Sequence, residues 1–252
     1  MLTLHALTTG YRHTIISRDL NATLPQGTLT ALLGTNGAGK STLLRTMARF
    51  QPPLAGSISW QGTDTALLSA RQLARTMSVV LTFKPEAEAL TAAEVVEMGR
   101  IPYTTMLSGT TEADRLAVEQ AMQLTHTTPF ARRPISTLSD GERQRVFIAK
   151  ALAQNTPVIL LDEPTAFLDF PAKIATMRLL KKLAHDAQKT ILLSTHDVEL
   201  ALHMADNLWL LNQQTLTSGS PQLLAANGCI GRFFNTEGVQ FDAATMRFDM
   251  RD

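Results

Sequence analysis

The sequence contains one cysteine, Cys229, in 252 residues, which excludes an internal disulfide framework and fits a reducing compartment. Long hydrophobic runs are also lacking, because the longest wholly apolar stretches have four residues, as at 158–161. A membrane-spanning helix needs about 20 predominantly apolar residues, and the uncharged stretch 20–39 contains glycine, proline, threonine and asparagine. We therefore expect no transmembrane span. The N-terminus has no basic region followed by an apolar block, so we expect no secretory signal.

An excess of charge of one sign is lacking as well. Lys and Arg total 23 against 22 Asp and Glu, a net charge of +1. This balance argues against a broad nucleic-acid-binding surface, and we expect no nucleic-acid partner. Apolar residues make up 44%, enough to build a full hydrophobic core.

The order of apolar patterns predicts an α/β fold. The wholly apolar or nearly apolar runs 28–33, 158–161 and 190–194 are typical of strands buried on both faces of a parallel sheet. Residues 84–155 have mostly helical composition, and a hairpin is predicted within 208–217. We therefore expect a mixed sheet with crossover helices. Residues 230–252 allow either a hairpin packed on the main domain or a dimer contact.

A glycine-rich segment follows the predicted strand 28–33. Residues 34–41 fit the phosphate-loop pattern Gly-x-x-x-x-Gly-Lys-Ser at every fixed position, with a helix predicted over 41–49. Glycines let consecutive backbone N–H groups face a phosphate, and the helix directs its positive end at the same anion. Lys40 can reach the β- and γ-phosphates, and the Ser41 hydroxyl can ligate Mg²⁺. The alternative is a turn that binds nothing.

Polar side chains also end the other two buried runs. Asp162 and Glu163 follow 158–161, and ligands sit at the carboxyl ends of strands in parallel sheets. We interpret Asp162 as the Mg²⁺ ligand and Glu163 as the base that polarises the attacking water. The alternative is a pair of acids that cap a helix or loop. His196 follows 190–194 and could orient the same water, if that strand lies beside the others; otherwise it is a structural histidine.

A second candidate anion site lies at 138–145, Leu-Ser-Asp-Gly-Glu-Arg-Gln-Arg, at the start of a predicted helix over 142–154. The structural alternative is an ordinary helix N-terminus. In that case Ser139 or Asp140 is the N-cap and Glu142 lies in the first turn.

Together these segments resemble the nucleotide-binding subunit of ABC transporters, from Tyr11 to about residue 221. Residues 34–41 resemble the Walker A loop of that family, 158–163 its Walker B strand, and 138–142 its signature, usually written Leu-Ser-Gly-Gly-Gln. Glu163 resembles the catalytic glutamate that leads into the D-loop, His196 the switch histidine, and Tyr11 an aromatic residue that stacks on adenine.

The resemblance implies a P-loop NTPase fold, in which a RecA-like mixed sheet flanked by helices carries an antiparallel β subdomain and a helical insertion. It implies one ABC ATP-binding domain over 1–252, with 1–83 and 156–252 as core and 84–155 as helical subdomain. It implies an ATPase with Glu163 and His196 as catalytic residues. Ser41 and Asp162 would be the metal ligands. The nucleotide-binding residues would be Tyr11, Gly34, Thr35, Asn36, Gly37, Ala38, Gly39, Lys40, Ser41, Thr42, Ser139, Gly141, Glu142 and Asp169.

In this family two subunits face head to tail, so the resemblance implies a second copy as partner. Lys40, Asp162, Glu163 and His196 would act in cis, and residues 138–142 on the ATP of the other copy. Removal of the γ-phosphate removes contacts that hold the closed dimer. The helical insertion would dock on a multi-pass membrane permease.

Residues 91–103, with Gly99-Arg100-Ile101-Pro102, resemble importers of iron–siderophore complexes, haem or cobalamin. That resemblance implies a peripheral subunit at the cytoplasmic face of a bacterial inner membrane, linked indirectly to an external solute-binding protein. The alternatives are a soluble ABC-type ATPase, such as one for iron–sulfur assembly, and a regulatory module that binds ATP without hydrolysis. Glu163 argues against the regulatory module, because the candidate base is present.

Two positions depart from the family. The Q-loop glutamine falls at Thr82 or Phe83, and neither side chain can replace an amide that contacts Mg²⁺ and the water. Asp140 replaces the first signature glycine. Because a carboxylate near a γ-phosphate costs electrostatic energy, we predict that Asp140 faces away from nucleotide in a closed dimer.

Overall fold

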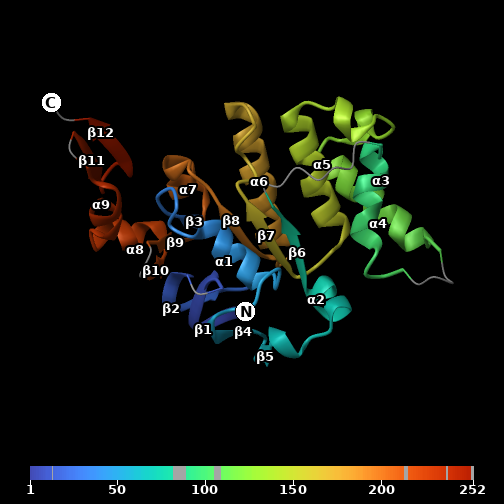
Figure 1. Cartoon of the computed structure of the whole chain (residues 1–252). Coiled ribbons are helices and arrows are strands. Elements are labelled where there is room, and N and C mark those ends of the chain that lie inside the picture. The colour runs from blue at the N-terminus through green and yellow to red at the C-terminus, as the bar shows by residue number, and fades with distance from the viewer. Residues whose placement is uncertain (13, 82–88, 105–108, 213–214, 237, 251–252) are drawn as a thin grey trace. The chain divides into compact units, whose positions relative to one another are not determined.

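The computed structural model describes residues 1–12, 14–81, 89–104, 109–212, 215–236 and 238–250 (Figure 1). The chain divides into two compact units. Unit 1 comprises residues 1–66 and 181–252, and unit 2 comprises residues 67–180. The division falls inside helix α6 (Phe170–Asp186).

An antiparallel sheet forms one part of unit 1. It consists of β1 (Leu2–Tyr11), β2 (Thr14–Leu24), β4 (Ala55–Trp60) and β5 (Thr63–Asp64), in the order β2-β1-β4-β5. Leu2, Leu4 and Leu7 of β1 are buried, and register shifts interrupt the pairing of β1 with β2. This sheet confirms the predicted antiparallel β subdomain.

The second sheet of unit 1 carries the phosphate loop. Its strands are β3 (Leu29–Leu33), β8 (Thr190–Ser194), β9 (Asn207–Leu211) and β10 (Leu216–Gly219), in the order β10-β9-β3-β8. Strand β3 is parallel to both neighbours, and β9 and β10 form the predicted hairpin. Every residue of β3 and β8 is buried, as expected for strands covered on both faces.

Helix α1 (Lys40–Met47) follows β3, and α7 (Val198–Met204) follows β8. The prediction placed the end of the first helix at residue 49, but α1 ends at Met47. Arg49 has a φ of 57°, in the left-handed region, so the chain turns before the two prolines at 52 and 53 are reached.

The C-terminal part of unit 1 contains α8 (Pro221–Ala226), α9 (Cys229–Phe234), β11 (Val239–Asp242) and β12 (Arg247–Met250). Strands β11 and β12 form an antiparallel hairpin, and its Phe241 and Phe248 rings lie 5.1 Å apart. The Phe248 N–H donates to the Glu199 carboxylate of α7 at 3.4 Å. Of the two alternatives for residues 230–252, the structure shows a hairpin that contacts the rest of its unit.

Unit 2 combines two parallel strands with helices. Strands β6 (Met77–Val80) and β7 (Val158–Asp162) pair in parallel, and α2 (Ala70–Thr76) precedes β6. Helices α3 (Ala92–Glu97), α4 (Glu112–Leu124) and α5 (Asp140–Ala153) pack around one apolar core, which includes Val96, Met122 and Val146. Unit 2 also contains the short 3₁₀ turns Met98–Arg100, Thr128–Phe130 and Ile135–Thr137, and the turn Thr65–Leu67 spans the point in the sequence where unit 1 gives way to unit 2. The helical stretch expected at 84–155 lies within unit 2, and its exact bounds as a subdomain stay a prediction.

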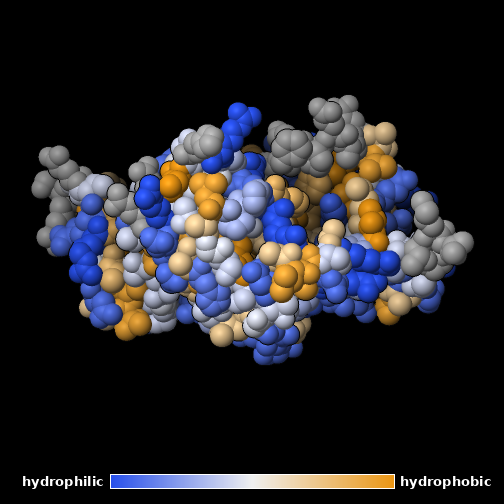
Figure 2. Space-filling model, turned by 60° about the horizontal axis from the view of Figure 1, so that its bottom comes forward, coloured by the Kyte–Doolittle hydropathy of each residue, from blue (hydrophilic) through white to orange (hydrophobic). Residues whose placement is uncertain are grey.

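The surface in Figure 2 shows hydrophobic residues in small groups among hydrophilic ones. Within the described ranges, no helix combines the length and the apolar character that crossing a bilayer requires.

Candidate functional site

The loop between β3 and α1 depends on its glycines. Gly37 and Gly39 have φ values of 78° and 98°, which side-chain-bearing residues rarely adopt. A Cβ added to Gly34 would lie 2.5 Å from the Leu211 carbonyl oxygen. Within the loop, the Ala38 N–H donates to the Thr35 carbonyl at 3.2 Å. The predicted curl of the loop is therefore present.

The N-terminus of α1 differs from those of four other helices. Helices α2, α3, α4 and α5 are each closed by a capping box, in which a Ser or Thr side chain accepts a first-turn N–H. The N-cap of α1 is Gly39, and no side chain caps this helix. Its first-turn N–H groups are therefore directed at the loop with no side-chain oxygen to accept them, which suits a phosphate.

Lys40 reaches across the loop. Its Nζ donates to the carbonyl oxygens of Gly34 at 2.7 Å and Thr35 at 3.2 Å, and the residue is 7% exposed. The ammonium group thus lies over the same backbone whose N–H groups would bind an anion. Ser41, next along α1, is exposed and its hydroxyl is accessible for a metal ion.

Tyr11 at the end of β1 is joined to α1. The Thr42 hydroxyl donates to the Tyr11 hydroxyl at 3.4 Å, and Tyr11 is 45% exposed. The structure therefore fixes one end of the ring beside the phosphate loop and leaves much of the side chain accessible. That arrangement suits a ring that stacks on a base.

A hollow of about 840 Å³ adjoins the loop, lined by Gly37 and by residues of β2 and β10. Ile16 and Arg18 of β2 belong to its lining, and a Cβ on Gly39 would lie 2.6 Å from Ile16 Cγ2. Sequence reasoning missed these two residues. No motif marks them, because β2 and the loop are separated in sequence and meet only in the folded chain.

His196 emerges at the same edge of the sheet as the phosphate loop. Leu32 pairs with Ser194 in the parallel register of β3 and β8, and the Thr195 N–H donates to the Leu32 carbonyl at 3.2 Å. The next residue, His196, is exposed. The expectation that the third strand lies beside the loop-bearing strand is confirmed for β3 and β8.

In unit 2 the predicted carboxylates end β7. Asp162 is 3% exposed. Glu163 has a φ of 51°, and its carbonyl accepts the Ala166 N–H at 3.2 Å in a tight turn. Ten non-glycine residues of the described chain have a positive φ, so this conformation shows that the chain turns at Glu163 and does not by itself mark a functional site.

Ser139 is the N-cap of α5, as the structural alternative predicts. It forms a capping box with Glu142, whose carboxylate accepts the Ser139 N–H at 2.9 Å and hydroxyl at 3.0 Å. These hydrogen bonds lower the pKa of Glu142. Asp140 is not the cap, and its carboxylate pairs with Arg143 one turn along the helix. The role of this segment toward nucleotide stays a prediction.

The signature segment packs against the segment after Glu163. A Cβ added to Gly141 would lie 3.3 Å from Leu168 Cδ2 and 3.4 Å from the Phe167 carbonyl oxygen. The next residue, Asp169, accepts the Ala172 N–H at 2.9 Å and so caps α6. Asp169 therefore has a structural role, and its nucleotide role stays a prediction. Thr82 and Phe83, where the Q-loop glutamine was expected, lie outside the described residues.

The sequence pattern of ABC transporters matches residues 17–166. The chain belongs to the ABC transporter family. It is 38% identical over 237 residues to the achromobactin transport ATP-binding protein CbrD of Dickeya dadantii, covering 94% of this chain and 88% of that protein. It is 38% identical over 232 residues to the petrobactin import ATP-binding protein FpuD of Bacillus anthracis, covering 92% and 85%.

Solved structures of ABC proteins resemble the chain closely. A dimeric bacterial ABC transporter cassette, MJ0796, superimposes with a TM-score of 0.78 at 29% identity, covering 88% of this chain and 99% of that one. An inward-facing transporter assigned to the metal-chelate type gives a TM-score of 0.79 at 28% identity, covering 92% and 88%. The predictions of an ABC-type ATPase and of a P-loop NTPase fold are confirmed. The predicted resemblance to siderophore and cobalamin importers is confirmed too, because relatives carry those names.

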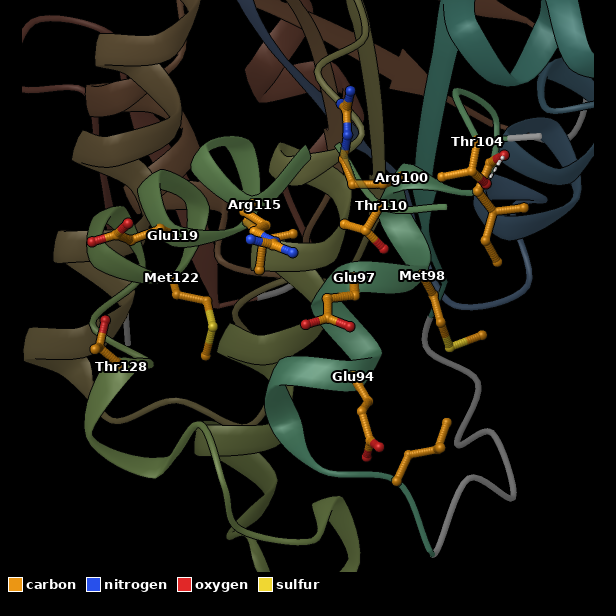
Figure 3. Close-up of a pocket in the computed structure, with 13 residues that line it drawn as sticks. Glu94, Glu97, Met98, Arg100, Thr104, Thr110, Arg115, Glu119, Met122 and Thr128 are labelled. Atoms are coloured by element: carbon orange, nitrogen blue, oxygen red, sulfur yellow. Dashed lines mark hydrogen bonds between the residues drawn. The ribbon is translucent and has the colours of Figure 1, made fainter. Parts of the chain in front are cut away.

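This ABC protein has a further pocket that the sequence did not predict. It lies in unit 2 between α3, the 3₁₀ turn Met98–Arg100 and α4, with a volume of about 550 Å³ (Figure 3). Glu97 comes from α3, and Arg115 and Met122 from α4; Figure 3 shows these side chains around the pocket. These residues are separated in the sequence, so the pocket forms only when α3 and α4 pack together, and no local motif indicates it.

Proposed function

We propose that this chain binds and hydrolyses ATP as the nucleotide-binding subunit of an importer for an iron–siderophore complex or cobalamin. The observation that carries the proposal is the glycine loop between a fully buried β3 and the uncapped α1, with Lys40 lying over it. The names of relatives, an achromobactin transport protein, a petrobactin import protein and a cobalamin import protein, support the solute class.

The residues fit a Mg²⁺–ATP substrate. Backbone N–H groups of residues 34–41 and the Lys40 ammonium bind the phosphates, and Tyr11 stacks on adenine. The exposed Ser41 hydroxyl and the Asp162 carboxylate are oxygen donors of the kind that Mg²⁺ prefers. When bound, Mg²⁺ would neutralise charge that develops on the β- and γ-phosphate oxygens.

Two further residues serve hydrolysis in this proposal. The Glu163 carboxylate accepts a hydrogen bond from the attacking water and takes its proton. His196 contacts the γ-phosphate and orients the same water. The position of Glu163 directly after the buried strand β7 supports its role, and the pairing of β3 with β8 supports that of His196.

A second copy completes the site in this proposal. Ser139, Gly141 and Glu142 of one copy face the ATP on the loop of the other. The dimeric cassette MJ0796 supports this arrangement, because 88% of this chain superimposes on it. Asp169, which lies just beyond the segment that contacts Gly141, would lie near the same interface.

We assign the pocket of unit 2 to a cytoplasmic segment of the multi-pass permease. Its lining combines apolar Met98 and Ile101 with the carboxylates of Glu94, Glu97 and Glu119 and the guanidinium groups of Arg100 and Arg115. Figure 3 shows the charged side chains around the pocket. Ile101 is 61% exposed. A helical segment with apolar and charged side chains fits this lining. The subunit would then be peripheral at the cytoplasmic face, with the external solute-binding protein on the far side of the permease.

The experiment is affinity purification of the tagged full chain from membranes of its native host, with ATPase assays of wild type and Glu163→Gln. We expect a multi-pass membrane protein to co-purify, and we expect Glu163→Gln to retain ATP binding while turnover falls at least about 100-fold. A soluble partner in place of a permease would favour the iron–sulfur assembly alternative. Unchanged turnover would contradict the role of Glu163.

A further inference from the structure

The signature of this chain carries a charge pair at the start of α5. Asp140 is the first residue of the helix, and its Oδ1 pairs with Arg143 Nη2 at i+3. The Arg143 side chain is 25% exposed and that of Asp140 45% exposed, so both groups are at the surface. The pair therefore lies in the segment that, under the proposed function, receives the triphosphate of a second copy.

The other hydrogen bonds at the N-terminus of α5 do not involve Asp140. Ser139 caps the helix, and Glu142 returns the capping hydrogen bonds. Arg133 donates to the Thr137 carbonyl at 2.6 Å and pairs with Glu142 at 3.4 Å. Removal of the Asp140 carboxylate would thus leave the capping box in place, so its pairing with Arg143 is separable from the fold of the helix end.

A carboxylate at this position opposes the binding of an anion. Like charges a few ångströms apart repel, more strongly when water is excluded between two protein surfaces. An adjacent guanidinium cancels most of that field and holds the carboxylate along the helix flank. The ion pair is therefore suited to masking the charge that Asp140 adds to the signature.

We propose that Arg143 is a positioning residue that neutralises Asp140, so that a signature with an aspartate still closes on the γ-phosphate bound to a second copy. This inference rests on the proposed function. Arg143 itself does not touch the phosphate; it acts through Asp140. Without Asp140, Arg143 is dispensable for closure.

The test is a double-mutant cycle measured in the full-length Glu163→Gln protein, which should retain ATP while hydrolysing it slowly. Light scattering gives the ATP concentration for half-maximal dimerisation. We expect Arg143→Ala to raise that concentration about tenfold or more, consistent with an unmasked like charge. We expect Asp140→Asn/Arg143→Ala to return it to within about twofold of Asp140→Asn alone, and Arg143→Lys to rescue most of the loss.

Controls separate this role from a structural one. Arg247→Ala removes one exposed positive charge from β12 and should leave the ATP concentration unchanged. A defect of Arg143→Ala that persists in the double variant, or no defect at all, overturns the inference. If the Glu163→Gln parent binds ATP but never dimerises, the proposed sandwich fails, and the inference with it.

Discussion

The Lys40 ammonium group donates a 2.7 Å hydrogen bond to the carbonyl oxygen of Gly34, at the opposite end of the phosphate loop. Together with the bond to Thr35, this contact closes the loop around a buried cation. A phosphate that enters the loop would meet the ammonium group and the N–H groups of α1 at one place. Under the proposed function, the chain itself would therefore preform the anion site.

Lys40→Ala should weaken ATP binding about 100-fold, because two or more charge-assisted hydrogen bonds to the phosphates are lost. Titration of a fluorescent ATP analogue measures the change. Lys182→Ala, at an exposed position of α6, is the matched control and should bind as wild type does. Equal affinity for the Lys40 variant would exclude loop 34–41 as the phosphate site.

Tyr11→Ala should weaken ATP binding by about tenfold, because ring stacking on a base contributes on the order of 1–3 kcal/mol. Tyr11→Phe keeps the ring and removes the hydroxyl that meets Thr42 at 3.4 Å, so its loss should be at most about twofold. Isothermal titration with ATP compares the two variants. A larger loss for Phe than for Ala would show that the hydroxyl, not the ring, binds nucleotide.

The Asp114 carboxylate should stabilise unit 2 above about pH 4 and lose that effect as the pH falls. Hydrogen bonds from Thr111, at 2.6 Å from its hydroxyl, and then from Arg100 at 2.8 Å lower the Asp114 pKa to about 2. A group whose pKa is depressed on folding stabilises the protein above its unfolded pKa, and this contribution disappears as the pH falls through the folded one.

Asp114→Asn should therefore lower the free energy of unfolding by about 2 kcal/mol at pH 7 and have little effect near pH 2. Urea unfolding at both pH values measures the free energy of unfolding of wild type and variant. Glu112→Gln, an exposed first-turn acid of the same helix, should change it by at most about 0.5 kcal/mol. A pH-independent loss for Asp114→Asn would refute the linkage.

Gly99→Ala should destabilise unit 2 by about 2–3 kcal/mol. A Cβ there would overlap the Lys150 carbonyl oxygen of α5 and lie 3.3 Å from the Ala153 Cβ. Calorimetric melting temperature is the readout. Gly231→Ala in α9 would place its Cβ 3.4 Å from the Asn235 side-chain amide, an ordinary van der Waals distance, and should be neutral or stabilising. A Gly99 variant as stable as wild type would mean that the 3₁₀ turn Met98–Arg100 can move away from α5 at low cost in free energy.

Much of the fold could be predicted because its signals are local. The phosphate-loop glycines, the apolar strands β3, β7 and β8, and the Ser139 capping residue are each set by neighbours in sequence. The end of α1 was missed, because the left-handed turn at Arg49 leaves no pattern that distinguishes it from helix. The hollow beside Gly37 and the pocket of unit 2 were missed because they need strands and helices that are far apart in sequence.

The sequence by itself determined the chemistry: a phosphate loop with Lys40, two acids at the end of a strand, and His196 after another. Such motifs can be recognised from the sequence alone, because each spans only a few neighbouring residues. Only the tertiary structure decided which groups meet. Parallel pairing brings His196 to the edge that bears the loop, and β1 carries Tyr11 to Thr42. These contacts depend on strand register and helix phase, which no single motif encodes.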